Sequence, residues 1–178
     1  MQDDHRATIR LFFALWPDDD LRAALLGARA GMAGEHARII HPNDLHLTLV
    51  FVGDVGPERL ECIESAGDDV ALGCFELALR RAESWPRQRL LVAVPDAAPP
   101  PLCELVSQLQ QNLLACGIEP EPRRFRPHVT LARRAARAAQ QPLTFDWSVR
   151  RFVLARSALG GGGGGGYQLL RTWPLEGW

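Results

Sequence analysis

Two short histidine–threonine motifs carry the residue types that acid–base chemistry on a phosphate requires. His46-Leu47-Thr48-Leu49 lies in the first half of the chain, and His128-Val129-Thr130-Leu131 follows 82 residues later. In a strand, alternate side chains share a face, so the histidine and threonine of each motif point the same way. Their Cα atoms then lie roughly 6.6 Å apart, which lets both side chains reach one phosphate.

Two imidazoles that face one cavity can divide the proton transfers of phosphodiester cleavage. One removes a proton from an attacking water, and the other protonates the departing ribose oxygen. Because the ordinary pKa of histidine is near 6.5, one neutral and one charged copy can coexist near neutrality. The threonine hydroxyls would hold the non-bridging oxygens. This chemistry needs no metal and predicts a bell-shaped kcat/KM across roughly pH 5–8.

The surrounding pattern places each motif on a strand that follows a proline-containing turn. Strands are predicted over 7–15, 37–41, 45–52, 74–83, 89–94, 128–133, 147–156 and 167–173. Helices are predicted over 18–31, 57–70 and 102–116, the last with Gly117 as its C-cap. Adjacent strands between single helices indicate antiparallel sheets, so an α+β fold is predicted.

Composition limits the class of protein. The 178 residues suit one domain, or two closely packed lobes that share a cleft. A net charge of -1 argues against gripping long nucleic acid by charge alone. All 20 basic residues are arginine, so any phosphate clamp must be a guanidinium group.

The four cysteines and the apolar segments bear on the compartment. Cys62, Cys74, Cys103 and Cys116 form no C-x-x-C pair and are predicted to be reduced core thiols. No apolar run reaches membrane-spanning length, and the first residues lack an apolar leader segment. A soluble cytoplasmic protein without membrane contact is therefore expected.

The motifs resemble those of the two-histidine phosphoesterase superfamily. Within it, the chain is similar to the RNA 2′,3′-cyclic phosphodiesterase family, historically called the 2′-5′ RNA ligases. The resemblance covers nearly the whole chain. It is carried by Arg10–Leu15, by Asn43–Leu49 with Val52-Gly53, and by Phe125–Arg133.

This resemblance implies a single bilobal domain over residues 1–178. Its two pseudo-symmetric lobes would each hold an antiparallel sheet flanked by helices, with the active-site cleft between the sheets. It implies hydrolysis of a terminal 2′,3′-cyclic phosphate on RNA or an oligonucleotide to a 2′-phosphomonoester. It also implies that His46 is the proton donor and His128 the proton acceptor, which near-symmetric motifs leave open. Thr48 and Thr130 are expected to bind phosphate in a monomer without metal or cofactor.

Arginines around the second motif are candidate substrate contacts. In a regular strand Arg134 shares the face of His128, whereas a twist or bulge at the strand end would bring Arg133 there. Arg124 and Arg126 flank the same motif and are further candidates for a phosphate contact.

Aromatic candidates for stacking on a base are less well defined. Phe13 is a possible contact, whereas the period-two pattern assigns Phe51 to the core. Trp85 and Tyr167 are the other candidates. The unbroken glycine run Gly160–Gly166 predicts a flexible loop between the last two strands.

Several alternatives stay open at this point. A zinc site built from His41, His46 and His128 lacks a recognisable ligand spacing. The enzyme could instead act on 2′-5′ linkages or small cyclic nucleotides, or the chain could be an RNA-end binding module without turnover. Intact histidine and threonine in both motifs favour an enzyme.

Overall fold

The strands and helices follow the predicted order along the chain. A computed structural model describes residues 8–157 and 166–177. The strands are β1 (Ile9–Leu15), β2 (Arg38–Ile39), β3 (Leu47–Val55), β4 (Phe75–Trp85), β5 (Leu90–Pro95), β6 (Val129–Arg133), β7 (Gln141–Val149), β8 (Arg151–Ser157) and β9 (Tyr167–Pro174). The α-helices are α1 (Asp19–Ala28), α2 (Leu60–Asp68) and α3 (Pro100–Leu113), with 3-10 turns η1 (Pro42–Asp44), η2 (Pro57–Arg59) and η3 (Leu114–Cys116).

Two four-stranded antiparallel halves meet at the motif strands. The strand order is β7-β4-β5-β6-β3-β1-β8-β9, and β2 pairs with β6. Within this order β6 and β3 are neighbours, and a single residue pair, Leu47 with Val129, joins them. Both residues are fully buried. The sheet is therefore continuous through the centre, where the resemblance implied a sheet in each lobe.

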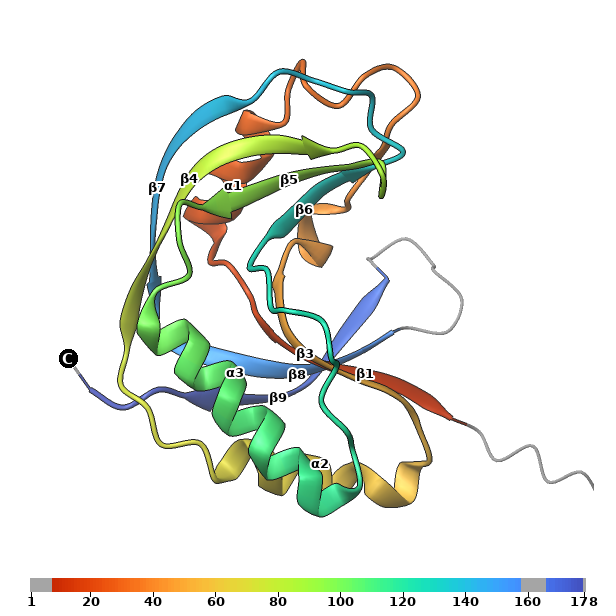
Figure 1. Ribbon diagram of the computed structural model, residues 1–178, viewed down its shortest axis with the longest axis vertical. Coiled ribbons are helices and arrows are strands. Elements are labelled where there is room, and N and C mark those ends of the chain that lie inside the picture. Colours follow the sequence, from red (N-terminus) through yellow and green to blue (C-terminus); the bar gives the residue numbers. More distant parts are fainter. Residues whose placement is uncertain (1–7, 158–165, 178) are drawn as a thin grey trace, which may run out of the picture.

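The two halves repeat a strand–helix–strand unit. The segment β1-α1-β3 belongs to one half and β5-α3-β6 to the other. Each helix packs on the opposite half, α1 against β7 and α3 against β3, and α2 lies beside α3 (Figure 1). The α+β fold with two lobes is confirmed. Because each of these two helices packs on a strand of the other half, the two lobes are held together.

Local sequence signals explain the helix boundaries. The Asp18 carboxylate accepts a hydrogen bond from the Leu21 N–H at 2.9 Å and caps α1. Helix α3 buries a stripe of apolar residues, Leu102, Leu105, Val106, Leu109 and Leu113. Gly117 follows η3 in the left-handed region with φ 70°, as expected of a C-terminal cap. The single strand predicted over 147–156 was wrong, because the chain turns at Arg150 between β7 and β8.

The prediction of four reduced cysteines was wrong for one pair. Cys62 on α2 and Cys116 on η3 form a disulfide, while Cys74 and Cys103 are free thiols. The packing of α2 against α3 and η3 brings together two residues that are 54 positions apart. No helix in the described ranges is long and apolar enough to cross a membrane.

Because the disulfide closes a loop of 54 residues, its loss should destabilise the fold. We expect Cys116→Ser to lower the free energy of unfolding by about 2–4 kcal/mol through greater chain entropy of the unfolded state. Urea unfolding of Cys116→Ser beside the exposed-thiol control Cys103→Ser measures this difference. Equal stability of the two variants would contradict it.

Candidate active site

One cavity collects the four motif side chains. It has a volume of about 530 Å³ and is lined by His46, Thr48, His128 and Thr130. The remaining lining residues are Arg10, Phe12, Arg38, Ile39, Ile40, His41, Asp44, Phe51, Arg133, Ser157, Gly166 and Tyr167. Both halves of the sheet therefore contribute to a single cavity at their junction.

The register at the junction explains how the motifs meet. Leu47 faces Val129, and in an antiparallel pair the next residues along face each other in turn. His46 then stands opposite Thr130, and Thr48 stands opposite His128. All four lie on the face away from the buried Leu47 and Val129. The two histidines occupy diagonal corners of this square.

Backbone carbonyls orient both imidazoles in the same way. His46 Nδ1 donates to the Asp44 carbonyl at 2.6 Å, and His128 Nδ1 donates to the Arg126 carbonyl at 2.7 Å. A carbonyl oxygen only accepts, so these contacts assign the proton to Nδ1 in the neutral rings. Each acceptor lies two residues before its histidine. Nε2 is left to act in the cavity, and in His46 it accepts from the Thr48 hydroxyl at 3.1 Å.

Burial makes both histidines weaker bases than usual. Desolvation lowers the pKa of His46 to about 4, although the Asp44 carbonyl and carboxylate partly oppose the shift. Desolvation likewise lowers the pKa of His128, opposed by its bond to the Arg126 carbonyl. The nearby Arg133 guanidinium adds to both shifts. With no anion bound, both rings are neutral at pH 7.

Aromatic rings enclose the two imidazoles. Trp16 stacks on His46 with ring centroids 5.0 Å apart, and Phe12 and Tyr167 pack on it at 5.0 and 5.1 Å. Trp85 packs on His128 at 4.6 Å. These contacts remove water from the rings, which is the cause of the desolvation.

A bulge follows the threonine in each motif. Ala14 pairs with Thr48 but Phe13 pairs with Val50, so Leu49 is an extra residue in β3. Val92 pairs with Thr130 but Leu91 pairs with Ala132, so Leu131 is an extra residue in β6. The face of the strand switches after each bulge. The fifth residue after each histidine, Phe51 or Arg133, therefore lies at the cavity.

The bulges and strand pairing correct two aromatic assignments. Phe51 is 62% exposed and lines the cavity, so its assignment to the core was wrong. Phe13 is fully buried against Phe152 and Trp173, so a substrate contact from Phe13 is excluded. Phe12, which pairs with Phe51 across the strands, lies at the cavity instead.

The arginine candidates separate in the same way. Arg133 lines the cavity, as the bulge alternative for this strand end anticipated. Arg134 is exposed outside it with φ 52°, so the regular-strand alternative was wrong. Arg126 also lies outside the cavity, because its guanidinium stacks on Trp85 at 4.1 Å. Arg126 acts on the site through its backbone carbonyl, which orients His128, and through its charge, which helps to lower the pKa of His128.

Sequence reasoning missed the role of Asp44 and the end of the glycine run. The Asp44 carboxylate accepts from the Gly166 N–H at 2.7 Å, which ties the start of β9 to the turn before His46. Its other oxygen is buried and has no hydrogen-bond partner among the residues that the structure describes. Residues 160–165 of the predicted loop lie outside the described residues.

Metal ligands do not cluster in this cavity. In the part of the chain that the structure describes, no three His, Cys, Asp or Glu side chains are placed to hold one ion. His41 lines the cavity, but its Nδ1 accepts the Asn43 N–H at 3.2 Å and caps η1.

Comparisons with known proteins agree with this geometry. The sequence profile described as LigT like Phosphoesterase matches residues 15–92 and 92–163. The chain belongs to this family. It is 31% identical to the RNA 2′,3′-cyclic phosphodiesterase of Escherichia coli strain K12 over 170 residues, covering 93% of this chain and 96% of that protein.

Other LigT-like phosphoesterases extend the comparison. The RNA 2′,3′-cyclic phosphodiesterase of Thermus thermophilus is 31% identical, covering 85% of this chain and 83% of that protein. The crystal structure of E. coli LigT complexed with 3′-AMP superposes with a TM-score of 0.85 at 29% identity, covering 95% and 99% of the two chains.

The opposite environments of Phe13 and Phe51 predict opposite effects on stability. We expect Phe13→Ala to lower the free energy of unfolding by about 3–5 kcal/mol, because it leaves a cavity in the core. Phe51→Ala should change it by less than about 0.5 kcal/mol. Denaturant unfolding of both variants checks this. Equal losses would contradict the bulge in β3.

Proposed function

We propose that this protein hydrolyses the terminal 2′,3′-cyclic phosphate of RNA or an oligonucleotide to a 2′-phosphomonoester. The observation that carries the proposal is the pair of imidazoles at diagonal corners of one cavity, each oriented by a backbone carbonyl. Relatives of similar length that are named RNA 2′,3′-cyclic phosphodiesterases support the substrate class.

The proposed reaction divides two proton transfers between the histidines. His128 Nε2 takes a proton from water, whose oxygen attacks phosphorus on the side away from the O3′ leaving group. A P–O bond to the water oxygen forms as the P–O3′ bond breaks. His46 Nε2 gives its proton to O3′, which leaves a 3′-hydroxyl and a 2′-phosphate. The residues thus act as acceptor and donor, and no metal or cofactor enters a step.

Hydroxyls and a guanidinium are available for the non-bridging oxygens. Thr130 stands opposite His46, and Thr48 stands opposite His128, so both hydroxyls border the space between the imidazoles. Once His46 is protonated, Nε2 no longer accepts from Thr48, and that hydroxyl is free to donate to phosphate. Arg133 lines the same cavity, and its guanidinium would stabilise the negative charge on the phosphate oxygens in the transition state.

His46, whose pKa is about 4 in the free protein, is protonated near neutral pH only if the bound substrate raises that pKa. A phosphate anion about 4 Å from an imidazolium contributes about 4 kcal/mol at the effective dielectric of a protein surface. That corresponds to about three pKa units. The anionic substrate therefore offsets the desolvation of His46 and charges the proton donor only when the site is occupied.

The aromatic side of the cavity suits the terminal base. Phe51 is exposed, and Phe12 packs against both Phe51 and Tyr167 with centroids 6.4 and 5.0 Å apart. Bases stack on such rings with little sequence preference. The crystal structure of E. coli LigT complexed with 3′-AMP supports a nucleotide as the ligand of such a site.

Two finer properties stay predictions. We expect the protein to act as a monomer, because one chain supplies all four motif side chains to the cavity. We also expect it in the cytoplasm, although the disulfide between Cys62 and Cys116 is more usual in oxidising compartments.

Removing either imidazole should abolish most turnover. We expect His46→Ala and His128→Ala each to lower kcat by about 10²–10⁴-fold on a short RNA with a 2′,3′-cyclic end. The reaction is run in EDTA, and the product is identified as a 2′- or 3′-phosphate. The control is His36→Ala, which removes an exposed imidazole away from the cavity. Equal losses in His36→Ala, a 3′-phosphate product, or no wild-type turnover in EDTA would each contradict the proposal.

The lowered pKa values shift the expected pH profile. The productive state has one proton on the pair, so kcat/KM falls below the lower pKa and above the higher one. Because both are lowered, that of His46 to about 4, we expect the maximum of kcat/KM on the acidic side of pH 6.5. The maximum of kcat should lie at higher pH, since bound phosphate raises both pKa values. Rate measurements from pH 3.5 to 9 test this, and a kcat/KM maximum above pH 7.5 would contradict it.

A further inference from the structure

Exposed arginines gather along one side of the cavity. Six of them, called here the arginine rim, are Arg38, Arg87, Arg89, Arg133, Arg134 and Arg137. They lie on β2, in the turn between β4 and β5, at the end of β6 and in the segment after it. Arg38 and Arg133 line the catalytic cavity itself, and the others continue away from it.

Strand pairing holds the rim together. Arg133 in β6 pairs with Arg38 in β2 on one side and with Leu90 in β5 on the other. The Ala135 N–H donates to the Arg89 carbonyl at 3.0 Å, which continues the contact beyond the strands. Neighbouring strands are about 4.8 Å apart, so the guanidinium groups stand on closely spaced rows.

No carboxylate neutralises the rim from within its own segments. Residues 36–43, 84–95 and 122–145 contain no Asp or Glu. Among the described residues, none of the six rim arginines forms an ion pair or donates a side-chain hydrogen bond. In a chain with a net charge of -1, this is a strong local excess of positive charge.

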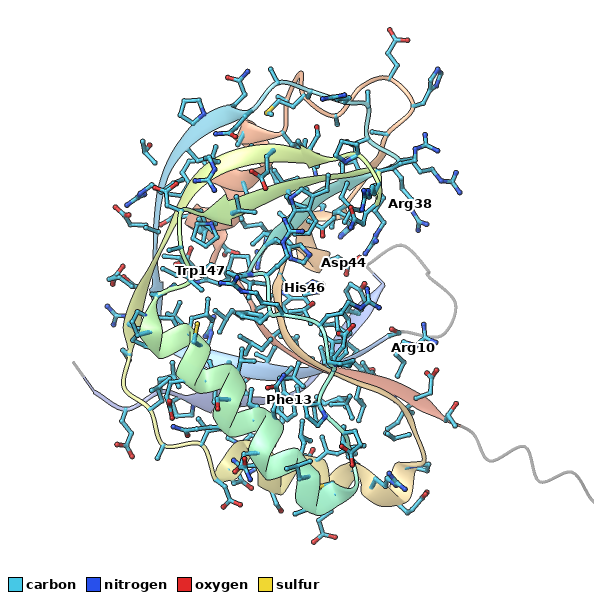
Figure 2. All side chains as sticks on the ribbon, in the orientation of Figure 1. Arg10, Phe13, Arg38, Asp44, His46 and Trp147 are labelled. Carbon is cyan, nitrogen blue, oxygen red and sulfur yellow. A yellow bond between two sulfur atoms is a disulfide. The ribbon has the colours of Figure 1, made fainter. Side chains whose placement is uncertain are left out.

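The far side of the cavity has the opposite character. Arg10 is held by the Asp54 carboxylate through two bonds of 3.0 and 2.8 Å, and Arg156 donates to the Gln168 side chain at 2.9 Å. Figure 2 places Arg38 on the upper lobe and Arg10 on the lower lobe, with Asp44 and His46 between them. Phe51 lies on the Arg10 side, on β3. The side with Phe51 and Arg10 therefore suits a base, whereas the side with Arg38 and Arg133 carries guanidinium groups that are unpaired among the described residues.

A second hollow extends the rim away from the catalytic cavity. Arg89 and Arg137 line a hollow of about 360 Å³ together with Trp85, whose ring packs on His128 at 4.6 Å. Arg89 and Arg134 also have positive φ, 54° and 52°, where a side chain other than glycine is disfavoured. Trp85 therefore connects the second catalytic histidine with the hollow that two of the outer arginines line.

We propose that the arginine rim binds the phosphates of the RNA strand on the 5′ side of the cyclic end. This inference rests on the proposed function and names its substrate class, an RNA of several nucleotides rather than a free cyclic nucleotide. Guanidinium groups bind phosphate in a bidentate way, and six unpaired ones are complementary to a polyanion. The strand leaves the cavity past Arg133 and Arg38 and continues toward Arg89 and Arg137.

The test separates binding of the strand from chemistry at its end. Arg89→Gln/Arg137→Gln removes two charges outside the catalytic cavity, and Arg59→Gln/Arg150→Gln removes two charges from exposed arginines elsewhere. Binding of a 5′-labelled 12-nucleotide RNA with a 2′-phosphate end is measured by fluorescence anisotropy from 50 to 250 mM salt. Hydrolysis of a nucleoside 2′,3′-cyclic phosphate is measured in parallel.

We expect the rim variant to weaken RNA binding by about ten-fold at 50 mM salt and to reduce the slope of log K against log salt by about 1.4. The control variant should bind like wild type, and all three should hydrolyse the mononucleotide within about two-fold of one another. Equal binding by the rim and control variants would overturn the rim while leaving the proposed function intact. Absence of wild-type hydrolysis of both the mononucleotide and a short RNA with a 2′,3′-cyclic end would count against the proposed function, and the binding result would still decide on the rim.

Discussion

The site depends on one antiparallel contact, the pair of Leu47 with Val129 between the two innermost strands. Both side chains are buried, and their burial turns the flanking histidines and threonines to the opposite face. A shift of one strand by one residue in this register would turn the histidine and threonine of its motif into the core and separate them from the other motif. The helices that each half packs on the other, α1 on β7 and α3 on β3, hold that register.

The same packing sets the chemistry. Trp16, Phe12 and Tyr167 exclude water from His46, and Trp85 does so for His128. Desolvation keeps both rings neutral at rest, so an anion is needed to charge the proton donor. The backbone carbonyls of Asp44 and Arg126 direct Nε2 of each ring into the cavity in either protonation state. Substrate binding and acid activation are therefore one event.

Much of this arrangement was predictable from two sequence patterns. Period-two alternation around His46 and His128 placed each histidine and its threonine on one face, and the order of strands and helices predicted the α+β class. The resemblance supplied the two lobes. The positions of the remaining site residues depend on strand pairing between segments far apart in the sequence. A bulge adds one residue to a strand and reverses the alternation after it, so Phe51 and Arg133 reach the cavity whereas Arg134 does not. In β1, which supplies no extra residue at the β3 bulge, Phe12 faces the cavity and Phe13 faces the core. The disulfide depended on helix packing between residues far apart in sequence, which no local pattern records.

The protonation states of the two imidazoles can be measured directly. The Hε1 and Cε1 signals of His46 and His128 are titrated by NMR, with and without a bound nucleoside 2′-phosphate, and are assigned with the single alanine variants. We predict that both pKa values lie below 6.5 in the free protein, that of His46 near 4, and that the bound phosphate raises the pKa of His46 toward neutrality. A His46 pKa at or above 6.5 in the free protein, or one that the phosphate leaves unchanged, would contradict it.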